Sequence, residues 1–139
     1  MLFALSICLH VVPAVVGLGQ ILGVGVLAST MRKNPTVPQP MLAVLRLFLR
    51  GSALALATVF LAGIAVEYTS GGAFHETWWF RLSFFQMPVL GALNALSLRA
   101  LRRLEGGRAK ELLGRIALRA WVMSALVAEI TLLMELKPW

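Results

Sequence analysis

The chain has 139 residues, of which 59% are hydrophobic and 14% charged, and its formal net charge is +7. A soluble domain of this length has too little interior to bury so much apolar surface. The hydrophobicity excludes a disordered chain, and the single cysteine, Cys8, excludes a disulfide scaffold. The composition therefore predicts a polytopic membrane protein.

Four apolar runs are long enough to cross a bilayer, which requires about 20 residues in a helix. They cover approximately residues 2–29, 45–68, 78–98 and 116–136, and the connections between them are short. Pro and Gly residues mark the first two connections, whereas the third is basic and has room for a short interfacial helix over 108–113. We expect an all-α, four-helix transmembrane bundle that forms a single domain over residues 1–139.

The basic residues gather in the first and third connections and at the adjoining ends of the spans. Of the 13 Lys and Arg residues, only Arg81 and Lys137 lie elsewhere. Because short loops rich in Lys and Arg stay in the cytoplasm, both termini are predicted to lie on the non-cytoplasmic side. The expected location is a bacterial inner membrane. The charge thus indicates orientation, and no nucleic-acid partner is expected.

The second and fourth spans begin with matching pairs of arginines, each pair separated by four residues and therefore on one helix face. The four residues are Arg46, Arg50, Arg115 and Arg119. We interpret them as contacts with anionic lipid headgroups on the cytoplasmic side, each contributing about 1 kcal/mol. A cytoplasmic pocket for an acidic lipid or another anionic ligand is the alternative.

The first span is rich in small residues, including Gly17, Gly19 and Gly23. Gly19 and Gly23 are four residues apart, a spacing that lets a second helix approach closely. We expect these glycines to pack the first helix within the bundle. A contact with another subunit, or room for a flat cofactor, are the alternatives.

Polar side chains at membrane depth carry the strongest functional signal, because a charged group there costs at least about 2.5 kcal/mol. Four such residues lie at one level, roughly 12 Å from the outer ends of their spans: His10, Gln86, Met87 and Glu129. A second layer, further in, contains Gln20 and Asn94. Helical spacing places His10 with Gly17, and Met87 with Asn94, on faces that we expect to point into the bundle.

Several interpretations of the outer layer remain open. His10 and Glu129 can satisfy one another, or share Gln86, as interhelical hydrogen bonds that contribute about 0.6–2 kcal/mol. His10 can instead be an axial ligand of haem b, with Met87 opposite it. A third interpretation assigns His10 and Glu129, with or without Met87, to copper or another transition metal. Proton or quinone chemistry is the fourth.

The first span also carries a family likeness. Leu9-His10-Val11, followed by Gly17-Leu18-Gly19, resembles the first helix of the CopD-like copper-resistance membrane proteins. It is similar, too, to the small four-span membrane protoporphyrinogen oxidases of the HemJ type. The resemblance covers the first helix and the four-span plan, and it implies a role for His10 in haem or metal handling.

No nucleophile triad, phosphate-binding glycine loop or metal-binding helix motif occurs in the sequence, so an enzyme is not indicated. We expect an accessory or structural subunit that docks, through its first helix, onto a larger membrane complex or a second copy of the chain. The alternative is a haem- or metal-binding membrane protein that uses the outer His, Met and Glu layer. His75 is expected in the outer connection, either solvated or folded over the outer mouth of the bundle.

Overall fold

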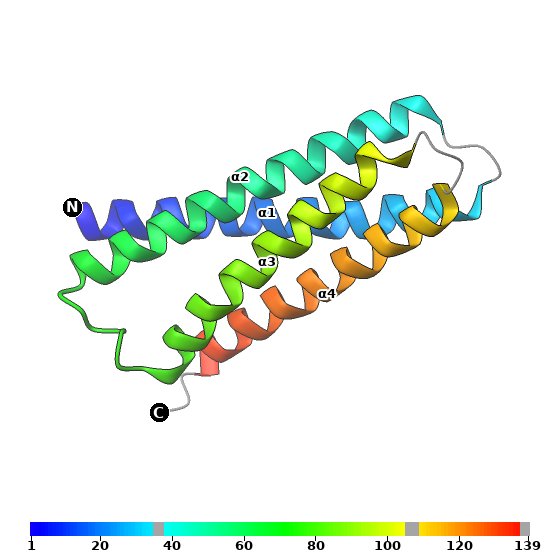
Figure 1. The fold of residues 1–139 in the computed structure, drawn as a ribbon. Coiled ribbons are helices and arrows are strands. Elements are labelled where there is room, and N and C mark those ends of the chain that lie inside the picture. The colour runs from blue at the N-terminus through cyan, green and yellow to red at the C-terminus, as the bar shows by residue number, and fades with distance from the viewer. Residues whose placement is uncertain (35–37, 105–108, 137–139) are drawn as a thin grey trace.

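The computed structural model describes residues 1–34, 38–104 and 109–136, with the backbone alone for Glu135. These residues form four long helices (Figure 1): α1 (Leu2–Lys33), α2 (Gln39–Thr69), α3 (Trp78–Arg102) and α4 (Ala109–Leu136). Each helix is long and apolar enough to cross a bilayer. The prediction of an all-α protein with four candidate membrane spans is therefore confirmed.

Two helices start earlier than the hydropathy indicates. α2 begins at Gln39, with Pro40 in its first turn, where the missing N–H of proline costs no hydrogen bond. α4 begins at Ala109, so the separate interfacial helix predicted over 108–113 is wrong, although Arg108 lies outside the described residues. The helix continues through this segment because Leu113 is fully buried and Glu111 pairs with Arg115 at 2.6 Å across one turn.

The helices run up and down in chain order, and each packs against two others. α1 contacts α2 and α4, and α3 contacts the same two helices; within the described ranges the diagonal pairs do not contact each other. We call the end with the connections after α1 and α3 the basic end, and the opposite end the open end. The N-terminus of α1 and the last turn of α4 lie at the open end.

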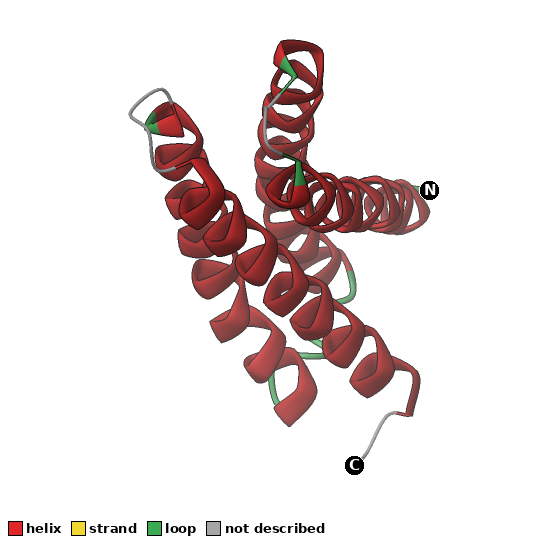
Figure 2. Cartoon of the chain, turned by 90° about the vertical axis from the view of Figure 1, so that its right-hand side faces the viewer, coloured by secondary structure: helices red, strands yellow, loops and turns green. Residues whose placement is uncertain are grey.

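The two helical hairpins converge at the basic end and diverge at the open end (Figure 1). Figure 2 looks at the molecule from the basic end and shows the first helix leading toward the N-terminus, away from the helix that leads to the C-terminus. The tightest packing lies in the basic half of the bundle, where Met31, Leu45, Leu113 and Ile116 are fully buried; Leu90, at the middle of α3, is fully buried where this core meets the cavity. The basic half is therefore filled by side chains, and the open half is left for a cavity.

Interhelical contacts in the basic half hold α4 between its neighbours. The Trp121 ring packs on Gly25 of α1, where a Cβ would lie 3.2 Å from the indole, and the indole N–H donates to Ser29 Oγ at 3.4 Å. On the other side, the Arg119 guanidinium donates to the Leu96 carbonyl of α3 at 2.9 Å. These contacts fix one end of both hairpins, from which the open ends diverge.

Candidate ligand-binding cavity

A cavity of about 310 Å³ lies between the two hairpins in the open half of the bundle. All four helices line it, with residues such as His10 and Gly17 of α1, Val59 and Gly63 of α2, Phe84 and Met87 of α3, and Val127 and Met134 of α4. Ser83 and Thr131 also line it, but each hydroxyl donates to the carbonyl four residues earlier in its own helix. The His10 imidazole and the Trp79 indole N–H are therefore the polar side-chain groups of the described lining that are not used up within their own helices, and only the imidazole can offer a nitrogen lone pair to a ligand.

The orientation of His10 is set by a hydrogen bond to the neighbouring helix. Nδ1 lies 2.9 Å from the carbonyl oxygen of Val59 in α2. A carbonyl oxygen can only accept, so Nδ1 carries the proton, and Nε2 of the neutral ring keeps its lone pair. No described residue is hydrogen-bonded to Nε2. Metal-ligating histidines commonly have this arrangement, in which the second ring nitrogen donates to a backbone carbonyl.

Gly63 makes room for the imidazole. A Cβ at this position would lie 3.3 Å from Cε1 of His10, which is closer than most Cβ contacts, and 3.5 Å from Nδ1, which is an ordinary contact distance. Gly63 follows Val59 by one helical turn, so the glycine exposes the backbone that accepts the hydrogen bond. The sequence did not lead us to predict contacts of His10 with Val59 or Gly63. A glycine in a neighbouring apolar span, at the level of His10, is the feature that could have indicated them.

Aromatic rings form the part of the wall between α2 and α3. The ring centroids of Phe60 and Phe84 are 5.4 Å apart, and those of Phe74 and Trp79 are 5.7 Å apart. All four residues line the cavity. Phe74 belongs to the connection between α2 and α3, so this connection supplies part of the wall at the open end.

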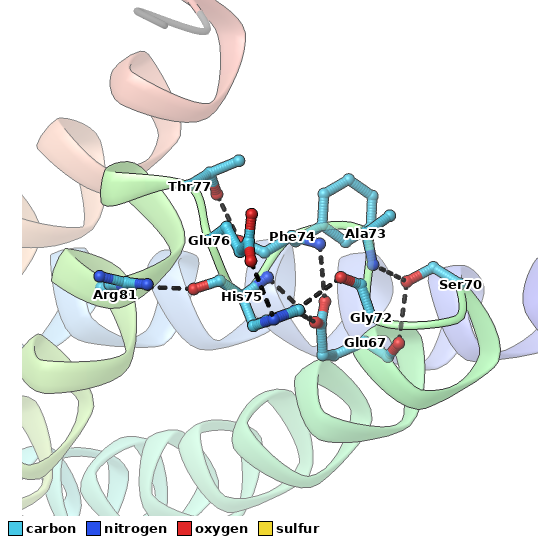
Figure 3. A network of polar contacts seen from close by, with 9 residues as sticks. All are labelled: Glu67, Ser70, Gly72, Ala73, Phe74, His75, Glu76, Thr77 and Arg81. Carbon is cyan, nitrogen blue, oxygen red and sulfur yellow. Dashed lines mark hydrogen bonds and ion pairs between the residues drawn. The ribbon is translucent and has the colours of Figure 1, made fainter.

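The connection between α2 and α3 is held by the carboxylate of Glu67 (Figure 3). This carboxylate accepts from the backbone N–H of Phe74 at 3.1 Å and of His75 at 3.0 Å, and from Nδ1 of His75 at 3.1 Å. Gly71 and Gly72 have φ values of +73° and +80°, which favour glycine and allow the chain to reverse. His75 itself is 59% exposed and does not line the cavity.

The structure divides the predicted outer layer into two parts. His10 and Met87 both line the cavity. Glu129 does not line it: it is exposed, and it accepts a hydrogen bond at 3.2 Å from Gln86 Nε2 on the outside of the α3–α4 hairpin. The described residues contain no group of three or more His, Cys, Asp and Glu side chains that could hold a metal ion.

The two residues of the second predicted layer, Asn94 and Gln20, also have different surroundings. Asn94 is 2% exposed, and its Nδ2 donates to the Leu49 carbonyl of α2 at 3.3 Å, while Ser52 Oγ lies 3.4 Å from its Oδ1. Gln20 packs instead on Gly51, where a Cβ would lie 2.5 Å from Nε2. Gln20 Oε1 is buried and has no hydrogen-bond partner in the described part of the chain. Asn94 therefore joins α3 to α2, and Gln20 belongs to the α1–α2 interface.

The glycines of α1 do not form one interface. A Cβ on Gly17 would lie 2.8 Å from the Ala55 Cβ, and one on Gly23 would lie 2.6 Å from the Phe48 ring, so both serve packing against α2. Gly19 has nothing within 4 Å of such a Cβ and is exposed. The predicted packing role thus fits Gly17 and Gly23, whereas Gly19 faces away from the bundle.

The predicted headgroup arginines have different surroundings. Arg46 and Arg50 are exposed on α2 and have no hydrogen-bond or ion-pair partner among the described residues. Arg115 is engaged by Glu111, and Arg119 by the Leu96 carbonyl. Among these four arginines, the α2 pair is the one without a partner in the described residues, while Arg115 is still 59% exposed beside Glu111.

No protein-family model matches the chain, and neither the curated proteins nor the solved structures contain a significant match. The likeness of the first span to the CopD-like and HemJ-type proteins thus stays a prediction that rests on the residues of α1.

Proposed function

We propose that the protein is an integral membrane binding protein that holds a flat lipophilic cofactor, haem b, in the cavity between its two hairpins. One observation supports this most directly: the His10 imidazole, held through Nδ1 by the Val59 carbonyl and without a partner at Nε2 among the described residues, lines a largely apolar cavity. Histidine is a common axial ligand of haem, and helical bundles build such sites from facing side chains.

The lining favours haem over a bare metal ion. Pockets for small organic ligands measure about 300–1,000 Å³, and this cavity lies at the lower end of that range. Met87 lines the same cavity and would supply a thioether as second axial ligand. With Glu129 outside the cavity, copper would have only His10 and Met87 from the predicted set. When bound, haem would supply one-electron chemistry, and His10 would supply a nitrogen ligand within a largely apolar lining.

The visible absorption spectrum of protein purified under haem-replete conditions tests this proposal. We expect a Soret band in the intact protein and its loss in His10→Ala. His75→Ala is the matched control, because it removes the other histidine, which lies outside the cavity, and should leave the band unchanged. A colourless protein, or a band that survives in His10→Ala, would refute the assignment; elemental analysis of the same samples separates iron from copper.

We propose further that the basic end faces the cytoplasm of a bacterium and that the protein resides in the inner membrane. The support is the concentration of Lys and Arg at that end, together with the exposed Arg46 and Arg50, which are free to meet anionic headgroups. In this orientation both termini and the cavity lie toward the non-cytoplasmic side.

A second candidate function, that of a subunit in a larger membrane complex, is favoured by a different observation. Docking through the glycines of α1 has little support, because Gly17 and Gly23 already pack against α2. The hydrogen bond between Gln86 of α3 and the exposed Glu129 of α4 supports instead a partner on the face formed by these two candidate membrane spans.

A further inference from the structure

Gln86 and Glu129 form a polar pair at membrane depth, in which Glu129 is exposed and Gln86 is partly buried, with its Oε1 buried and unpartnered among the described residues. Gln86 lies about 12 Å along α3 from Trp78, where that helix begins, and Glu129 lies inside the apolar span of α4. Intramembrane carboxylates generally face the interior of a bundle, a water-filled cavity or another ionisable group. Glu129 is exposed, does not line the cavity, and has the neutral amide of Gln86 as its hydrogen-bond partner. The carboxylate therefore lacks a counter-charge in the described part of the chain.

Six exposed residues of α4, Glu129 among them, form a continuous stripe. Alternating steps of four and three residues place them on one helix face: Leu118, Val122, Ala125, Glu129, Leu132 and Leu136. We call this stripe the α4 seam. All its members are exposed. This spacing is typical of coiled coils, in which a second helix packs against the stripe by knobs-into-holes packing. A single polar residue within such a stripe specifies the partner. Ala125, one turn from Glu129, lets the second helix approach closely.

We infer that the α4 seam binds a transmembrane helix of another protein, and that this helix carries a Lys or Arg at the depth of Glu129. The inference extends the second candidate function, membership of a larger complex, and does not depend on the His10 cavity. Charge complementarity identifies the occupant: a carboxylate in hydrocarbon is satisfied by a cation on the facing helix.

A second copy of the chain does not supply this cation. If two copies pack seam on seam about a twofold axis along the membrane normal, Glu129 lies at the same depth as the Glu129 of the second copy, and like charges repel. The described arginines nearest along α3 and α4 are already engaged: Arg81 donates to the His75 carbonyl at 2.9 Å and Arg119 to the Leu96 carbonyl. The seam therefore fits a heterologous partner.

Site-specific photo-crosslinking in the native membrane tests the inference. A benzophenone amino acid replaces Val122 or Leu132 in the seam, or, for comparison, Val15 of α1 or Leu54 of α2, which are 67% and 72% exposed. We expect one protein adduct from the seam positions and none from α1 or α2. Peptide mapping should place the crosslink in a transmembrane helix that contains Lys or Arg. Glu129→Gln should lower the adduct yield by about tenfold, equivalent to about 1.4 kcal/mol.

Glu129→Gln preserves the size of the side chain and an acceptor for Gln86, so we expect the variant to fold. Glu76→Gln makes the same change of charge on a side chain that is 84% exposed in the connection, and should leave the adduct unchanged. Adducts with a second copy, with lipid, or with a helix that lacks a basic residue would overturn the inference, as would full yield in Glu129→Gln. The Soret band is expected to survive Glu129→Gln, so failure here is separable from failure of the haem proposal.

Discussion

His10 of α1 donates a hydrogen bond from Nδ1 to the backbone carbonyl of Val59 in α2, at 2.9 Å. The bond joins two helices across the wall of the cavity and fixes which ring nitrogen remains available. It depends on the absent side chain of Gly63, since a Cβ there would lie 3.3 Å from the ring. A histidine that ligates a cofactor needs such a second partner to hold its ring in one orientation.

Gly63→Ala should displace the imidazole by a few tenths of an ångström and weaken the bond to Val59. Overpacking of this kind costs about 1–3 kcal/mol, so we expect about tenfold weaker haem binding in a titration followed by absorbance. Imidazole nitrogen NMR of histidine-labelled protein should show the altered Nδ1 hydrogen bond without any cofactor.

Gly19→Ala is the matched control for this substitution. Nothing lies within 4 Å of a Cβ at Gly19, so the added methyl group meets open space. Alanine in a helix interior is favoured over glycine by roughly 0.5–1 kcal/mol, and this variant should be slightly more stable. Equal effects of the two substitutions would contradict a specific role for Gly63.

The apolar runs predicted the four helices because crossing a bilayer demands length and hydrophobicity, both of which are read directly from the residues. The inward orientation of His10 followed from its spacing to Gly17 on one face of α1. The direction of Glu129 did not follow, because all faces of a membrane helix are apolar and periodicity then says little about which face is interior. The contact between His10 and Val59 could not be predicted either, because the two residues are 49 positions apart in the sequence and meet only through the relative alignment of α1 and α2.

The buried amide of Asn94 should contribute measurably to stability. Asn94→Ala removes the bond to the Leu49 carbonyl and the contact with Ser52, and we expect a loss of about 1–3 kcal/mol in the free energy of unfolding. A double-mutant cycle with Ser52→Ala should give a coupling of about 0.6 kcal/mol, measured in mixed detergent micelles. Ser124→Ala is the control, because the Ser124 hydroxyl bonds only within its own helix; a coupling to Asn94 as large as that of Ser52 would argue against the interhelical contact.

Glu67→Ala should release the connection between α2 and α3. The carboxylate accepts from the N–H groups of Phe74 and His75, and hydrogen bonds to a charged group contribute about 1.5–3 kcal/mol. Amide exchange at these two residues, followed by mass spectrometry, should accelerate by at least about tenfold. Glu76→Ala, at an exposed side chain 3.8 Å from the His75 ring, should have little effect. Unchanged exchange in Glu67→Ala would mean that the connection is held by other contacts.

The orientation of the bundle can be tested with single cysteines, because Cys8 is the one native thiol. In a Cys8→Ser background, Ala73→Cys places a thiol at the open end, on an exposed residue of the connection between α2 and α3. Ala73 is preferable to Gly71, whose φ of +73° disfavours any side chain. A membrane-impermeant maleimide should label Ala73→Cys in intact cells, and should label Glu111→Cys, at the basic end, only after the membrane is opened. The reverse pattern would place the basic residues outside, against the rule that loops rich in Lys and Arg remain in the cytoplasm.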